Sequence, residues 1–88
     1  MHDVSDEVDD SFAHSKLVEA VENQLANGEP PAAQATLNKL TLVGYSREDS
    51  LDLMAQVLAH RIGVMLDEDL PFDNAAYEQA LRNLPDLP

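Results

Sequence analysis

The clearest helical signal in the chain lies in residues 46–66, SREDSLDLMAQVLAHRIGVML. Apolar residues recur there every three or four positions, which is the spacing of one face of an α-helix. They are Leu51, Met54, Ala55, Leu58, Ile62 and Met65. Ser46 is placed to cap the helix, because its hydroxyl can accept a hydrogen bond from the backbone N–H of Asp49. The Asp49 carboxylate can in turn bond back to Ser46 and complete a capping box. The stretch therefore predicts a long helix over 46–66.

The same stretch carries a second set of apolar residues, Leu53, Val57 and Val64. At about 100° per residue, this set lies roughly 120° around the helix from the first one, with His60 beside it. A helix on the outside of a bundle needs only one apolar face. Two faces mean that the helix is surrounded within its own chain, or that one face is left for another chain. Both alternatives stay open, and the second makes these four residues a candidate interaction surface.

Length and composition limit the fold. A chain of 88 residues forms one domain with a modest core. Without Trp, and with only two Phe and two Tyr, that core must be built from Leu, Val, Ala and Met. The absence of Cys removes disulfides, thiol nucleophiles and Cys-based zinc sites.

The net charge of −12 is concentrated at the two ends of the chain. Residues 1–10 carry five acids and no Lys or Arg, which gives −5, and residues 67–88 carry six acids and one Arg, which again gives −5. Residues 11–66 contribute the remaining −2, from six acids and four bases. Such a chain should repel nucleic acid and anionic membranes, since both bind through basic residues. We therefore expect no nucleic-acid partner and no membrane partner.

The first ten residues, MHDVSDEVDD, are polar and acidic. They predict a disordered acidic tail, which leaves residues 11–88 as a single helical domain. They also lack the basic and apolar regions of a signal peptide, and no apolar run approaches the length of a membrane span. These features predict a soluble, cytoplasmic protein.

Three further helices are predicted, over residues 11–27, 31–42 and 74–83. Gly28 is suited to end the first, because glycine readily adopts the left-handed conformation. Asp73 can cap the last, with Phe72 and Tyr77 spaced as a hydrophobic staple. No strand pattern occurs, so the sequence predicts an all-α fold, a small bundle of four helices with the third helix central.

Several short patterns occur together: Val21-Glu22-Asn23-Gln24-Leu25, Gly28-Glu29-Pro30-Pro31, Thr36-Leu37, Leu40, Gly44-Tyr45-Ser46-Arg47, Val57-Leu58-Ala59, Pro71-Phe72-Asp73, Tyr77 and Leu81. In this combination, over residues 18–85, the chain resembles a group of small bacterial proteins and domains of unknown function. An acidic residue often follows the Leu-Ala pair in that group, where this chain has His60. The resemblance implies a compact helical fold in a bacterium and brings no catalytic residues with it.

The residues that could support chemistry form no known motif. His2, His14 and His60 lack the HxxxH or HExxH spacing of a zinc site. The acidic run of residues 67–69 lacks the glycine and the twelve-residue spacing of an EF-hand loop. Glycine-rich phosphate loops and GxSxG are absent as well. We therefore expect no metal, no cofactor and no catalytic residue, and the chain is predicted not to be an enzyme.

The function predicted from these patterns is non-catalytic. The chain is expected to be a protein–protein interaction module or a homodimer that uses the second face of the central helix. The alternative is an acidic inhibitor that imitates nucleic acid and competes for a basic partner protein. Acids gathered in a tail and a loop count against this alternative, because imitation needs carboxylates spread over a rigid framework.

Overall fold

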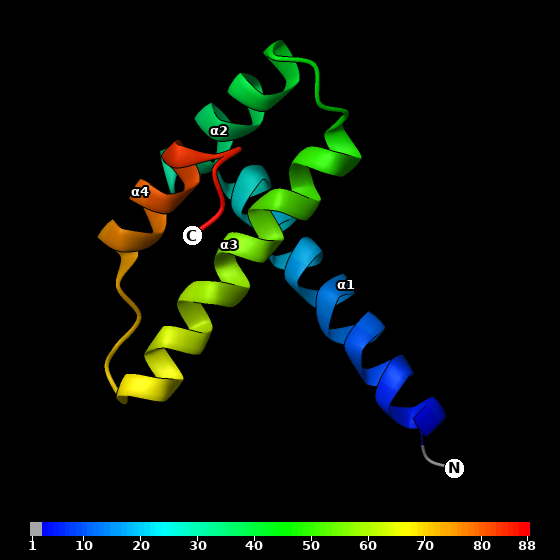
Figure 1. The fold of residues 1–88 in the computed structure, drawn as a ribbon. Helices are drawn as coiled ribbons and strands as arrows, with labels where there is room; N and C mark the ends of the chain where they lie inside the picture. Colours follow the sequence, from blue (N-terminus) through cyan, green and yellow to red (C-terminus); the bar gives the residue numbers. More distant parts are fainter. Residues whose placement is uncertain (1–2) are drawn as a thin grey trace.

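The computed structural model describes the backbone of residues 3–88 and the side chains of residues 12–88. This part of the chain contains four helices and no strand (Figure 1). The helices are α1 (Asp3–Asn27), α2 (Pro31–Leu42), α3 (Arg47–Glu68) and α4 (Asn74–Asn83). Helix α3 packs against each of the other three. The predicted all-α class and the central position of the third helix are therefore confirmed.

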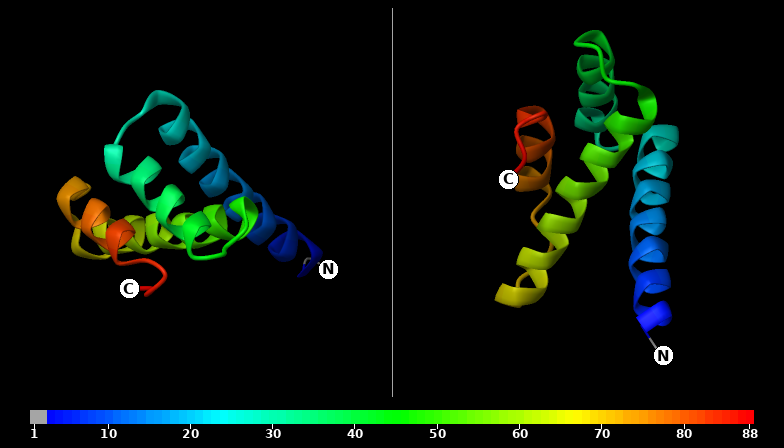
Figure 2. Two further views of the ribbon diagram at one scale, coloured as in Figure 1. Left: turned by 90° about the horizontal axis from the view of Figure 1, so that it is seen from above. Right: turned by 45° about the vertical axis from the view of Figure 1, so that its right-hand side comes forward.

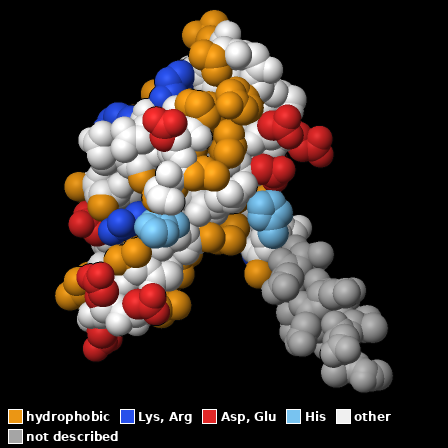
Figure 3. Space-filling model, in the orientation of Figure 1, with side chains coloured by type: hydrophobic (Ala, Val, Ile, Leu, Met, Phe, Trp, Pro, Cys, Tyr) orange, Lys and Arg blue, Asp and Glu red, His pale blue; other side chains and the backbone are white. Residues whose placement is uncertain are grey.

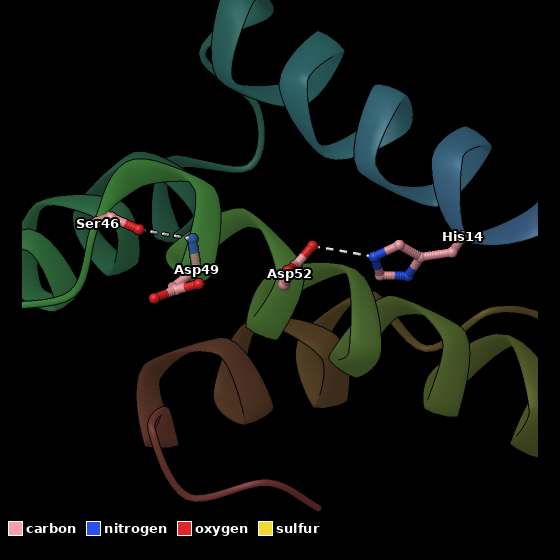
Figure 4. A network of polar contacts seen from close by, with 4 residues as sticks. All are labelled: His14, Ser46, Asp49 and Asp52. Carbon is pink, nitrogen blue, oxygen red and sulfur yellow. Dashed lines mark hydrogen bonds and ion pairs between the residues drawn. The ribbon is translucent and has the colours of Figure 1, made fainter. Parts of the chain in front are cut away.

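Helix α3 begins as its sequence predicts. The Ser46 hydroxyl accepts a hydrogen bond of 3.0 Å from the backbone N–H of Asp49 (Figure 4). The expected return bond from the Asp49 carboxylate is not among the hydrogen bonds of the described residues. The helix ends at Glu68, two residues later than predicted, where Asp69 takes a left-handed conformation with φ of 55°.

Helix α1 begins earlier than its sequence predicted. It starts at Asp3, whereas the sequence predicted a start at residue 11. The disordered acidic tail over residues 1–10 stays a prediction. This stretch holds no Gly or Pro to break a helix, and its acids are favoured near the positive end of the helix dipole. Met1 and His2 lie outside the described residues.

The remaining predicted boundaries agree with the structure. Helix α1 ends in a Schellman motif: Gly28 has φ of 73° and donates to Leu25, while Glu29 donates to Gln24. The Asp73 carboxylate caps α4 by accepting a bond of 3.1 Å from the backbone N–H of Ala76. These bonds join residues three to five positions apart, so the local sequence specifies them.

The core forms where α2, α4, the second half of α1 and the first half of α3 come together (Figure 2). Its buried apolar residues are Val21, Ala32, Ala33, Leu37, Leu40, Leu51, Met54, Ala55, Val57, Leu58, Tyr77, Leu81, Leu84. Alanines at three of these positions allow close helix packing, while leucines fill most of the volume. The other halves of α1 and α3 run out of this core and diverge from each other (Figures 1 and 2).

Candidate interaction surface at the end of helix α3

The four predicted surface residues of α3 do not share one environment. Val57 is completely buried, in the same apolar cluster as Leu81 and Leu84. Val57 is therefore a core residue, and its predicted place on a surface for another chain is corrected. The reason is that the apolar side chains of the other helices and of the segment after α4 form one buried cluster with this part of α3. Leu53 is partly buried against the same cluster.

The other two predicted residues lie beyond the covered part of α3. His60 is exposed and Val64 is half-buried. Leu58 is the last buried residue of the helix, and no residue between 59 and 70 is buried. Along its first half α3 is thus surrounded by its own chain, and along its second half it is not. The first alternative, a helix surrounded within its own chain, describes the first half of α3. The second alternative, a face left for another chain, stays a prediction for the second half.

The uncovered half still carries large apolar side chains. Leu66 is 70% exposed and Leu70 is 55% exposed, while Ile62 and Met65 are half-buried. We call residues 59–66 together with Leu70 the free end of α3. Sequence reasoning missed Leu66 and Leu70, although Leu66 lies four residues after Ile62 and so continues the first apolar stripe.

A groove of about 460 Å³ runs between the free end and the loop that leads to α4. Most of its lining side chains are apolar, and they include Val64, Met65, Leu70, Pro71 and Phe72. Apolar lining with a few polar groups is typical of surfaces that bind other molecules.

Arg61 lines the same groove. Its Nε atom is buried without a hydrogen-bond partner, and Arg61 forms no ion pair with any carboxylate of the described residues. Residues 53–66 contain no Asp or Glu, whereas the acids of residues 67–69 follow at the tip of the helix. Figure 3 shows this arrangement, with a histidine and a basic side chain beside exposed apolar atoms and acids below them.

No family model, curated protein or solved structure matches this chain. The resemblance to small bacterial helical proteins therefore stays a prediction. Within residues 3–88, no helix combines the length and the apolar character that crossing a bilayer requires.

A second, wider depression lies between α1 and the start of α3. His14 and Asp52 meet there, with 3.0 Å between the ring Nε2 and a carboxylate oxygen (Figure 4). His60 lies eight residues beyond Asp52, about 12 Å along the helix, so the two histidines do not form one site. No three His, Asp or Glu side chains of the described residues are grouped as metal ligands.

Tyr77 carries the only shifted pKa among the described residues. Its ring is 2% exposed, and burial raises the pKa of its hydroxyl above the ordinary value. The hydroxyl donates a hydrogen bond of 2.8 Å to Oε1 of Gln24. This hydrogen bond joins α4 to α1. The burial of Tyr77 and this bond together indicate a structural role for the residue.

Proposed function

We propose that the chain is a non-catalytic protein–protein interaction module whose contact surface is the free end of α3. One observation carries this proposal: α3 continues for about three turns beyond its last buried residue, with Leu66 on the helix and Leu70 just after its end both exposed to solvent. Helices in proteins draw most of their stability from packing an apolar face. A partner that covers the free end would supply this packing.

Grouping of the apolar residues supports the proposal more than their exposure does. A single exposed leucine is ordinary in a soluble protein. Contiguous apolar surface with a polar rim is characteristic of interaction sites. Here Ile62, Met65 and Leu66 lie three or four positions apart on one face of α3, and Leu70 borders the adjoining groove.

The proposed setting is a bacterial cytoplasm. The bacterial part rests on the resemblance, and the compartment rests on the absence of cysteine from the sequence. The partner in this setting is a protein, either a second copy or a different chain.

The acidic inhibitor is a second candidate, and one observation favours it. The backbone of residues 3–10 is helical, and this stretch carries five of the seventeen acids. A rigid array of carboxylates is what imitation of a phosphate backbone requires. In this function the basic partner would be held mainly by charge, and salt would release it.

A capture experiment separates the two functions. Immobilised wild type, Leu66→Lys and Leu42→Lys are each exposed to a bacterial lysate at about 0.1 M and about 0.5 M salt. Leu42 is the matched control, because it is an 87% exposed leucine at the end of α2. Circular dichroism checks that each variant stays helical.

The interaction module predicts capture that survives high salt, is lost in Leu66→Lys and is kept in Leu42→Lys. If the chain is the acidic inhibitor, we expect it to capture basic nucleic-acid-binding proteins. This capture should disappear at high salt and should be equal for wild type and both variants. Salt-tolerant capture that Leu66→Lys leaves unchanged would exclude the free end of α3 as the contact surface.

A further inference from the structure

We propose that the free end of α3 binds a basic amphipathic helix of another protein. The apolar face of that helix lies in the groove, and its Lys and Arg side chains lie against the acids around the groove. This inference rests on the proposed function and names the chemical class of the partner.

The groove supplies the apolar half of this contact. Val64, Met65 and Phe72 are half-buried side chains of its lining, and Leu70 in the same lining is exposed. Leu66, next to Met65 in the chain, is exposed as well. A partner helix that lays an apolar face here removes apolar surface of both molecules from water, which favours binding.

Acidic side chains accompany the exposed leucines. Residues 67–69 are all acids and are all exposed. Glu68 and Asp73 also line the groove. Residues 59–74 contain these four acids and one base, Arg61, which gives a charge of −3. Figure 3 shows the acids among exposed apolar atoms at the lower end of the molecule. A basic segment therefore complements this surface, and an acidic segment is repelled from it.

The end of α3 also lacks the cation that a helix end favours. Helix α2 has Lys39 in its last turn and α4 has Arg82, whereas the last turn of α3 contains no base. The C-terminal end of a helix carries a partial negative charge. The carboxylates of residues 67–69 add to this negative charge. Lys or Arg from a partner would offset both, so this end favours a cationic ligand.

The fold indicates the conformation of the partner segment. The described residues contain no strand, so there is no sheet edge to which an extended peptide could add. Proline-rich segments dock in aromatic grooves, and Phe72 is the single aromatic residue of this lining. An amphipathic helix laid in an apolar groove is the recognition mode that fits.

A second copy of the chain does not supply such a helix. The sequence has five Lys and Arg residues, and α1, α2 and α4 each contain only one of them. The two in α3, Arg47 and Arg61, are about four turns apart. None of the four helices has an apolar face flanked by several cations, so the partner is a different protein.

The depression between α1 and the start of α3 is acidic too, but it offers less apolar contact. Its apolar lining consists of Val18, which is half-buried, and Leu51, which is buried. A basic helix would meet carboxylates there without an exposed apolar side chain. This depression therefore provides the charge control for the experiment.

Fluorescence titration with synthetic peptides tests the inference. The chain has no Trp, so a Trp in the peptide is the only indole in the sample. The basic probe is a peptide of about 18 residues, roughly five helical turns, with Leu and one Trp along one face and Lys elsewhere. The acidic probe has Glu in place of each Lys. We expect the basic probe to bind wild type with a Kd of about 1–50 µM and the acidic probe to bind at least about tenfold more weakly.

Neutral substitutions test the apolar contact separately from charge. Leu66→Gln and, independently, Leu70→Gln should weaken binding of the basic probe by about fivefold or more, because each removes apolar surface without adding a charge. Leu42→Gln is the matched control at an exposed leucine on α2 and should leave the Kd unchanged. Circular dichroism checks that each variant stays helical.

A pair of charge variants tests the acids. Asp67→Asn with Glu68→Gln should weaken binding of the basic probe by about threefold to tenfold and make the Kd less dependent on salt. Glu22→Gln with Glu48→Gln removes the same charge from the depression between α1 and α3. This control should change the Kd by less than about twofold, since it acts only through long-range attraction.

Three results would overturn the inference: a basic probe that does not bind at about 100 µM, an acidic probe that binds equally well, or equal weakening by the two charge variants. If the chain still captures a protein from the lysate and loses it in Leu66→Lys, the proposed function stands and only the partner class is wrong. If that capture is also unaffected by Leu66→Lys, both are wrong.

Discussion

Tyr77 connects the last helix to the first through one hydroxyl group. It donates to Gln24, 53 positions away, and its ring meets Phe72 edge-on at 5.6 Å. We expect Tyr77→Phe to lower the free energy of unfolding by about 1 kcal/mol, because it leaves the half-buried Gln24 amide without this partner. Urea denaturation measures the change. Tyr45→Phe is the control, because Tyr45 forms no side-chain hydrogen bond among the described residues, and it should cost less than about 0.5 kcal/mol. Equal losses in the two variants would contradict the assigned role of the bond.

The raised pKa of Tyr77 predicts a loss of stability in alkali. Unfolded chains release the phenol proton near pH 10, whereas burial keeps it on the folded protein to higher pH. Above about pH 10 the unfolded state therefore binds fewer protons than the folded state, and stability falls as pH rises. The difference in stability between wild type and Tyr77→Phe should shrink above this pH. A difference that stays constant from about pH 8.5 to pH 11 would show that the hydroxyl is not shielded.

Valine occurs in both halves of α3, at Val57 in the covered half and at Val64 in the uncovered half, so the two positions allow a matched comparison. We expect Val57→Ala to destabilise the fold by about 2 kcal/mol, because it removes fully buried methyl groups and leaves a cavity. Val64→Ala should cost less than about 1 kcal/mol, since Val64 is only half-buried and its site can fill with solvent. Chemical denaturation of dilute samples measures both. Similar costs would mean that α4 does not cover α3 as the structure shows.

At the scale of the element, the start of α3 depends on one side chain. We expect Ser46→Ala to lower the free energy of unfolding by about 1 kcal/mol, because the N–H of Asp49 loses its partner. Ser15→Ala, at an exposed position inside α1, is the matched control and should be nearly neutral. Urea unfolding of the two variants checks this prediction. If Ser46→Ala leaves the free energy of unfolding unchanged, a hydrogen bond from water replaces the Ser46 cap without loss of stability.

At the scale of the whole molecule, we expect residues 1–10 to contribute little to the stability of the fold. The parts of α1 packed against the core include Leu17, Val18 and Leu25, all well after residue 10. Deleting residues 1–10 leaves Ser11 free to cap the shortened helix. At a concentration too low for association, we expect the melting temperature to change by only a few degrees. A fall of about ten degrees or more, measured by circular dichroism, would show that residues 1–10 are docked on the rest of the chain.

The sequence alone determined the local structure of this protein. Ser46, Gly28 and Asp73 set helix ends through bonds to residues at most a few positions away. Apolar spacing determined which side chains share a face, and together these features predicted four helices with α3 at the centre. The start of α1 at Asp3 differs from the predicted residue 11, because the acidic first residues carry no apolar pattern that marks a helix start.

Only the tertiary structure decided which apolar faces are covered. Val57 and Leu66 both belong to apolar stripes of one helix, yet the first is fully buried and the second is 70% exposed. The difference depends on where α4 packs and on where α1 and α3 diverge. The periodicity of the sequence shows which side chains share one face of a helix. The way in which the helices cross, set by contacts across the whole chain, decides which residues pack against that face.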